Sequence, residues 1–236
     1  FYITAKAFGR FAYDLNDFDA SQLVEVIPQF HDTRNRYRQL EEAIREDRVG
    51  RVKEVQAEID FIQSRKADCF LLYDLLDEGV LPLRVTHNDT KLNNIMFDSQ
   101  TKEPLCIVDL DTVMPGLVLF DFGDSIRFGA NDCAEDEPDL SKVSFDFDLY
   151  ETYVKGFIEG TNGILTEAEL EYLPWGARVI TLEQGIRFLT DYINGDVYYQ
   201  TSRPGQNLDR ARTQLKLVQD MENSWDQMVQ AVQNMK

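Results

Sequence analysis

The sequence is short of basic residues and has no long apolar run. Of its 236 residues, 24 are Lys or Arg and 42 are Asp or Glu, which gives a net charge of −18 at pH 7. Nucleic acids and anionic membranes are bound through clustered cations, so this charge balance argues against both partners. No stretch approaches the ~20 apolar residues of a membrane span, and no basic-then-apolar leader is visible.

Cysteine is also scarce. The chain has three cysteines, Cys69, Cys106 and Cys133, which are odd in number and far apart in the sequence. Such spacing does not form the paired framework of a small secreted protein, so we interpret them as reduced thiols. Reduced thiols are typical of the cytoplasm, and we expect the protein to be cytoplasmic.

What the chain does have is enough apolar sequence for a full core. It is 43% hydrophobic and 28% charged, and its length suits one large domain or two small ones. Residues 33–78 are rich in helix-forming residues with apolar positions three and four apart, and Gly50 is expected to separate two helices of a hairpin. Helical periodicity returns after residue 119 and continues to the end of the chain.

Short β-type runs interrupt this helical pattern in the middle of the chain. Residues 83–86, 94–97 and 105–110 are apolar, contain β-branched residues and are separated by polar turns. The sequence therefore predicts an α+β fold that is mainly α-helical, with a small hairpin or strand island. Chemistry usually lies on loops that a rigid scaffold positions, so this island is the place to search for a site.

The stretch "RVTHNDTKLNNIMFD", residues 84–98, joins two of the predicted strands and contains four polar residues with a recognisable spacing. His87, Asp89, Lys91 and Asn94 match the H-x-D-x-K-x-x-N pattern of the kinase catalytic loop. A carboxylate at Asp89 can accept the proton, or a hydrogen bond, from a substrate hydroxyl. Lys91 can offset the charge of the transferring phosphoryl group, and Asn94 offers an oxygen that suits Mg²⁺. His87 is expected to be structural and to pin the loop.

Two further carboxylates follow in "CIVDLDTVMPG". Asp109 lies 15 residues beyond Asn94, and a strand is expected to deliver Asp109 and Asp111 to one face. Asp109 would then share a metal ion with Asn94, while Asp111 could serve the substrate or a second metal. Taken singly, such residues near turns are more often structural. Four matched positions together with Asp109 favour a phosphoryl-transfer site.

The tripeptide Asp121-Phe122-Gly123 has the letters of the kinase metal-binding motif, but its spacing is wrong. It lies 27 residues beyond Asn94, about twice the distance that the kinase pattern requires. It also opens a helix-like segment, where an aspartate can serve as the N-terminal cap. We therefore predict that Asp109 is the metal ligand and that Asp121 is structural.

The same stretches resemble a known family. The catalytic-loop stretch, the "IVDLDT" strand and "DFGDSIR" are similar to the aminoglycoside phosphotransferase and choline kinase group of kinase-like enzymes. "HNDTKLNNIMFD", "PLCIVDLDTVMPG" and "DFGDSIRFGA" are similar in more detail to the bacterial N-acetylhexosamine 1-kinases. "VIPQFHDTRNRY" and "GIRFLTDYINGDVYY" extend the resemblance over most of the chain.

The resemblance implies a two-lobed kinase fold and ATP-dependent phosphorylation of the anomeric hydroxyl of GlcNAc or GalNAc. By match of motif, Asp89 would be the catalytic base, and Asp121 an anchor beside the catalytic loop. The metal would be Mg²⁺, held with ATP by Asn94 and Asp109. The sugar contacts would fall on Arg187, Tyr198 and Thr112.

One departure from the family concerns the lobe that grips ATP. Residues 1–86 contain no strand with a Gly-rich loop and no strand lysine paired with a helix glutamate. We therefore expect residues 1–236 to be the C-terminal lobe, with the N-terminal lobe absent or supplied as a partner, and to be inactive alone. Two alternatives remain open: a different acceptor (an aminoglycoside, choline or homoserine), or a non-catalytic kinase-like binding module.

Overall fold

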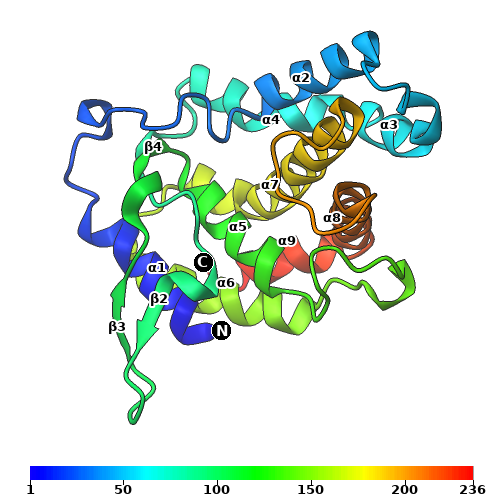
Figure 1. Cartoon of the computed structure of the whole chain (residues 1–236). Helices are drawn as coiled ribbons and strands as arrows, with labels where there is room; N and C mark the ends of the chain where they lie inside the picture. Colours follow the sequence, from blue (N-terminus) through cyan, green and yellow to red (C-terminus); the bar gives the residue numbers. More distant parts are fainter. Residues whose placement is uncertain (236) are drawn as a thin grey trace.

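The computed structural model describes residues 1–235, and their fold is a helical body with two small antiparallel sheets (Figure 1). The helices are α1 (Tyr2–Asp14), α2 (Thr33–Glu46), α3 (Gln56–Gln63), α4 (Lys66–Asp77), α5 (Val118–Gly129), α6 (Phe147–Thr161), α7 (Glu167–Asn194), α8 (Gln206–Asn223) and α9 (Trp225–Gln233). The strands are β1 (Arg84–Thr86), β2 (Ile95–Phe97), β3 (Pro104–Ile107) and β4 (Met114–Gly116), and short 3₁₀ turns include η3 (Leu92–Asn94) and η4 (Leu110–Thr112). The predicted α+β, mainly helical fold is confirmed.

Helix α7 is the centre of the body. It runs through the middle of the molecule in Figure 1, begins with a capping box between Thr166 and Glu169, and ends at Gly195 in the left-handed conformation. Its first half joins an apolar cluster with α5 and α6, and its second half joins a second cluster with α2, α3 and α8. A helix that is apolar on most sides must be buried, and α7 therefore links both halves of the core.

Helices α5 and α7 approach each other closely through glycine. A Cβ atom added to Gly123 would lie 2.6 Å from the carbonyl carbon of Gly176, which is nearer than real Cβ atoms come. A Cβ atom added to Gly176 would in turn lie 2.9 Å from the carbonyl carbon of Leu119 in α5, so both residues must be small for the two backbones to touch. This contact fixes α5 against the central helix, and α5 in turn carries residues of the site.

The structure corrects the predicted hairpin of residues 33–78. Gly50, at φ +74°, does separate two helices, but the region contains three helices because the chain breaks again between α3 and α4. At that break Arg65 donates from its guanidinium to the carbonyl of Phe61 (2.8 Å) and to Glu222 of α8 (2.6 and 2.8 Å). Tertiary contacts from a distant helix thus set this boundary, and local periodicity does not contain them.

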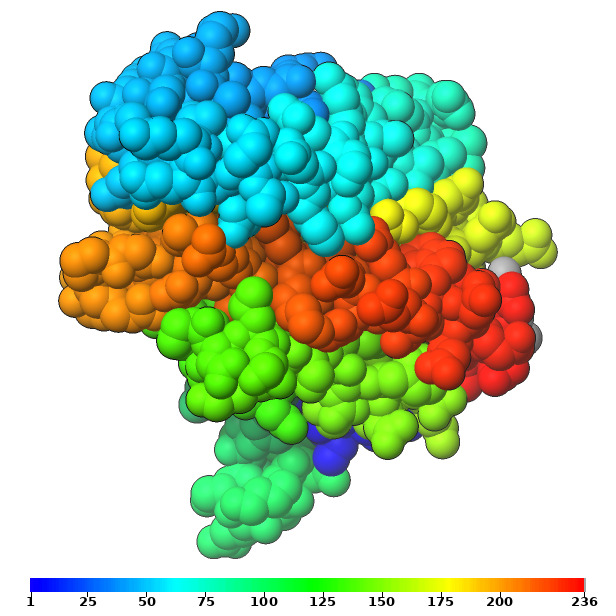
Figure 2. All heavy atoms as spheres, turned by 90° about the vertical axis from the view of Figure 1, so that its right-hand side faces the viewer, coloured from blue at the N-terminus to red at the C-terminus, as the bar shows by residue number. Residues whose placement is uncertain are grey.

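The strand island is present, with one strand more than predicted. β1 pairs with β4 and β2 pairs with β3, both antiparallel, and the β2–β3 hairpin projects at the bottom of Figures 1 and 2. Strand β4 was not predicted, because two of its three residues, Pro115 and Gly116, disfavour strands. The third predicted run ends early, at Ile107 rather than residue 110.

The environment of the cysteines agrees with reduced thiols. Among residues 1–235 all three cysteines are free, with Cys69 buried, Cys106 exposed and Cys133 half-buried. Burial raises the pKa of the Cys69 thiol to about 12, so this side chain is an inert part of the core.

Among residues 1–235, no helix combines the length and the apolar composition that a membrane span requires.

Candidate active site

The loop after β1 is held by a buried carboxylate of α5. The backbone N–H groups of His87 and Asn88 donate to the two oxygens of Asp121, at 2.8 and 2.7 Å. Burial raises the pKa of Asp121 to about 6, although both N–H bonds favour the charged form. Asp121 lies inside the first turn of α5, whose N-cap is Leu117, so the expected capping role is wrong. Its contacts are those of an anchor for the loop.

The loop is also held from the side of η4. The hydroxyl of Thr112 donates to the carbonyl of His87 at 2.7 Å, and the Asn88 side-chain amide donates to the carbonyl of Thr112 at 2.9 Å. Thr112 therefore supports the backbone of the catalytic loop. Its sugar contact stays a prediction.

His87 is fully buried and bonds both to the same loop and to the residue after β3. Its Nε2 lies 3.1 Å from the carbonyl oxygen of Val108, and its Nδ1 lies 3.3 Å from the backbone N–H of Asp89. One nitrogen faces an acceptor and the other a donor, which fits a neutral ring with its proton on Nε2. His87 thus ties the loop to the end of the β2–β3 hairpin.

Three of the predicted site residues meet at one carboxylate. Asp89 Oδ1 lies 2.7 Å from Lys91 Nζ, and Asp89 Oδ2 accepts a bond from Asn94 Nδ2 at 3.0 Å. Asn94 Nδ2 also donates to the Asp89 carbonyl at 2.8 Å, which leaves its Oδ1 without a hydrogen bond among the described residues. The Asp89 and Lys91 side chains are 22% and 38% exposed, so both are accessible to a ligand.

Asp109 follows a residue whose backbone bonds to Asn94, but it does not lie on a strand. The N–H of Val108 donates to the carbonyl of Asn94 at 2.9 Å, and Asp109 follows as an exposed residue with φ +61° and ψ +56°. β3 has already ended at Ile107, and Asp111 lies in η4, so the expectation that one strand face carries both carboxylates is wrong. Left-handed backbone, which Asp tolerates better than most residues, turns the chain at this point.

The donor set fits magnesium. In residues 1–235 no group of three or more His, Cys, Asp or Glu side chains forms a metal cluster. Mg²⁺ bound with a nucleotide needs only one or two protein oxygens, since phosphates and water provide the rest. The free amide oxygen of Asn94 and the exposed carboxylate of Asp109 match that requirement.

Asp89 opens into a cavity of about 510 Å³. Its walls come from the segment before α2, from the loop after β1, from α5, from α7, from the loop that follows α7 and from α8. They include Asp89, Lys91, Asp124, Arg127, Gln184, Arg187, Tyr199 and Arg210. The cavity is therefore rich in hydrogen-bond donors.

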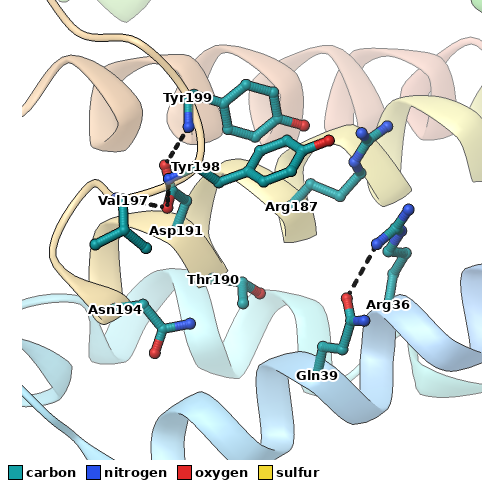
Figure 3. Close-up of a pocket in the computed structure, with 9 residues that line it drawn as sticks. All are labelled: Arg36, Gln39, Arg187, Thr190, Asp191, Asn194, Val197, Tyr198 and Tyr199. Atoms are coloured by element: carbon teal, nitrogen blue, oxygen red, sulfur yellow. Dashed lines mark hydrogen bonds between the residues drawn. The ribbon is translucent and has the colours of Figure 1, made fainter. Parts of the chain in front are cut away.

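A smaller cavity of about 280 Å³ adjoins the first and is drawn in Figure 3. Arg187 and Tyr199 line both cavities, whereas Tyr198 lines only the smaller one and is 72% exposed. Of the two predicted sugar contacts on this side, only Arg187 thus shares a cavity with Asp89. Its guanidinium lies 5.3 Å from the Phe30 ring and 5.8 Å from the Tyr199 ring.

The loop carrying the two tyrosines is tied to α7 by Asp191. The carboxylate of Asp191, which is 4% exposed, accepts the backbone N–H groups of Val197, Tyr198 and Tyr199 at 2.8–3.0 Å (Figure 3). This anchoring holds the loop over the cavity.

Several residues that line the two cavities were not predicted from the sequence, because no local pattern distinguishes them from ordinary helix or loop residues. They are Asp191, His31, Asp124, Arg127, Gln184 and Tyr199.

Asp124 and Arg127 form a buried ion pair at the floor of the larger cavity. Arg127 Nη2 lies 2.8 Å from Asp124 Oδ1, and the other Asp124 oxygen accepts the N–H of Thr90 at 3.0 Å. Burial is the largest single influence and would raise the pKa of Asp124. The charges of Arg127, His31 and Lys91 and the hydrogen bond from Arg127 together outweigh it and lower that pKa. Arg127 also donates to Glu135 at 2.9 Å, so its charge is shared.

A loop that presents a carboxylate, a lysine and an asparagine amide beside a polar cavity, on a helical lobe, defines the class of kinase-like phosphotransferases. The chain belongs to the phosphotransferase enzyme family (APH), whose pattern matches residues 4–151. The structure is similar to that of choline kinase from Cryptosporidium parvum, with a TM-score of 0.54 and 14% identity over 98% of this chain and 67% of that chain. At this identity the similarity concerns the fold, which is kinase-like as the sequence predicts.

Proposed function

We propose that this chain is the catalytic lobe of a kinase that transfers the γ-phosphoryl group of ATP to a hydroxyl of a small sugar. The acceptor we favour is an N-acetylhexosamine, phosphorylated at its anomeric hydroxyl. The supporting observation is the contact of Asp89 with both Lys91 and Asn94 at the mouth of a cavity rich in donors.

The proposed step is an in-line displacement. The acceptor oxygen forms a bond to the γ-phosphorus, the bond from that phosphorus to the β–γ bridging oxygen breaks, and ADP leaves. Asp89 orients the hydroxyl and takes its proton, while Lys91 offsets charge on the transferring group. Asn94 and Asp109 are the residues that would hold Mg²⁺, which neutralises phosphate charge when it is bound.

The arginines of the cavity favour a neutral, hydroxyl-rich acceptor over a cationic one. Arg187 covers the rings of Phe30 and Tyr199, and Arg210 lies 5.5 Å from the ring of Phe188. A quaternary ammonium group such as that of choline needs open aromatic faces, and here arginines already cover them. Guanidinium groups are instead good multiple donors to sugar oxygens or to an acetamido carbonyl.

The proposal includes a second lobe that grips ATP and is not part of residues 1–236. An apolar groove of about 1,020 Å³ between α1 and the β2–β3 hairpin supports it, with Ile3, Leu105 and Leu110 all at least 40% exposed. Exposed apolar area of this kind usually marks a contact surface. We expect the 236-residue chain alone to show no turnover.

The test uses the intact protein with Mg-ATP and a panel of N-acetylhexosamines, aminoglycosides, choline and homoserine. Asp89→Asn should lower kcat by roughly 10²–10⁴-fold, since it removes the proton acceptor and leaves the fold. Asp17→Asn, at an exposed position far from the loop in sequence, is the control. A variant at Asp89 that keeps its rate would contradict the mechanism, and turnover confined to another acceptor would replace the sugar.

A further inference from the structure

His31 is a buried histidine with an acceptor at each ring nitrogen. It is 8% exposed, its Nδ1 lies 2.8 Å from Glu183 Oε2, and its Nε2 lies 3.0 Å from the carbonyl oxygen of Asn88. Carboxylate and carbonyl oxygens only accept hydrogen bonds, so each nitrogen must carry a proton to satisfy both contacts. The geometry therefore requires the charged imidazolium form.

The charges around the ring support the same form. Glu183, which is 1% exposed, also lies 3.6 Å from Arg36 of α2 and 3.6 Å from Arg187 of α7. From α5, Asp121 and Asp124 act on His31 as further negative charges. Burial is the largest single influence and opposes a charged ring. The charge and hydrogen bond of Glu183, the bond to the Asn88 carbonyl and the charge of Asp124 together outweigh it and raise the pKa of His31.

The residue that His31 holds is the one before the proposed base. Asn88 has φ +64°, its N–H donates to Asp121 at 2.7 Å, and its carbonyl accepts from His31. The peptide plane on each side of Asn88 is thus fixed by a different helix or segment. Asp89 continues directly from this plane, so the direction of its side chain depends on these bonds.

We propose that His31, as an imidazolium ion, is a positioning residue that holds Asp89 in its productive orientation through the carbonyl of Asn88. Glu183 connects this contact to Arg187, so the acceptor cavity and the catalytic loop share one buried carboxylate. The inference rests on the proposed phosphotransferase function for its kinetic consequences, whereas the charged state of His31 stands independently of it.

Loss of the proton removes one of the two bonds, because a neutral ring has a single N–H to donate. The bond to Asn88 and the bond to Glu183 then compete for that proton. We expect kcat to fall as the pH rises through the raised pKa of His31, with little change in KM for ATP. In Glu183→Gln the negative charge is absent, so this alkaline fall should move to lower pH by about 1–3 units.

The first measurement is ¹⁵N NMR of the histidine rings in the 236-residue chain at pH 7. Both nitrogens of His31 should show imidazolium shifts, and the amide of Asp89 should move in His31→Gln but not in Arg34→Gln. Arg34→Gln is the matched control, because it removes a cation near the same start of α2 whose ion pairs are with Asp32, Asp74 and Asp77 and not with Glu183. A neutral His31, or an unmoved Asp89 amide, overturns the proposal whatever the protein's activity.

The second measurement is the pH profile of the intact protein on its best acceptor. His31→Gln should lower kcat at least about tenfold, a loss that a small misplacement of a catalytic group can produce, and Arg34→Gln should not. An active wild-type enzyme whose His31→Gln variant keeps both kcat and pH profile refutes the positioning role. If no acceptor is phosphorylated, the proposed function fails, and the NMR result alone decides the role of His31.

Discussion

The buried pair of Asp124 and Arg127 makes a stability prediction whose sign depends on pH. Arg127→Met removes the guanidinium that lies 2.8 Å from Asp124 and leaves a carboxylate that is 4% exposed without its main partner. Removing one member of a buried ion pair destabilises a protein by about 3–5 kcal/mol. We expect a loss in the free energy of unfolding of that size at pH 8.

The pH dependence follows from the pKa of Asp124. In the folded wild type the pKa of Asp124 is lowered. The pair therefore stabilises the fold at pH values above the pKa of an unfolded Asp, ~3.9. This stabilisation is lost as the pH falls through the lower pKa of the folded state. In Arg127→Met, burial is opposed by the charges of His31 and Lys91, and we expect it to raise the pKa of Asp124 above the unfolded value, so that stability falls as pH rises. The loss should therefore be smaller at pH 5 than at pH 8, by about 1.4 kcal/mol for each unit by which the pKa of Asp124 in the folded variant exceeds 5.

The assay is urea unfolding, monitored by the fluorescence of Trp175 and Trp225. The centroids of these two rings lie 4.9 Å apart in the folded protein. Arg48→Met, which breaks an exposed ion pair with Glu46, controls for the change in net charge. The double variant Asp124→Asn, Arg127→Met should recover much of the loss, because it leaves no buried charge. A loss below about 1 kcal/mol at both pH values, or no recovery in the double variant, would refute the reasoning.

Two further predictions concern the supports of the site. Gly123→Ala should lower the free energy of unfolding by about 1–3 kcal/mol in the same assay, because the new Cβ atom would overlap the backbone of Gly176. An unchanged urea midpoint would show that α5 can move away from α7. Thr112→Val removes the 2.7 Å hydrogen bond to the His87 carbonyl, and we expect it to lower the free energy of unfolding by about 0.5–1.5 kcal/mol. Thr112→Ser keeps the hydroxyl and should keep that stability. Equal losses in both variants would count against this role of Thr112.

The grouping of the candidate catalytic residues was predictable because they are close in sequence. Asp89, Lys91 and Asn94 lie within six positions, and a single turn of chain brings them together at the distances that the structure has. The existence of short strands was also readable from composition. What the local pattern could not show was the backbone of Asp109, whose left-handed conformation ends the hairpin two residues beyond β3.

The proposed acceptor side of the site was not readable from local patterns, because its parts are far apart in the chain, and only the family resemblance pointed to Arg187. His31 comes from the segment before α2, Gln184 and Arg187 come from α7, and Tyr199 comes from the loop after it. Each has an ordinary local explanation as a helix or loop residue. Their meeting depends on how α7 packs against α2 and α5, which is a property of the whole core.

The letters of Asp121-Phe122-Gly123 have three structural reasons in this fold, and none of them is metal binding. Asp121 accepts the N–H groups of His87 and Asn88, Phe122 is fully buried among aromatic rings of α6, and Gly123 permits the contact with α7. Changing any one would disturb the catalytic loop indirectly, because α5 positions that loop. The tripeptide would thus act on the proposed chemistry only through support of Asp89, while the carboxylate that we propose for the metal is Asp109.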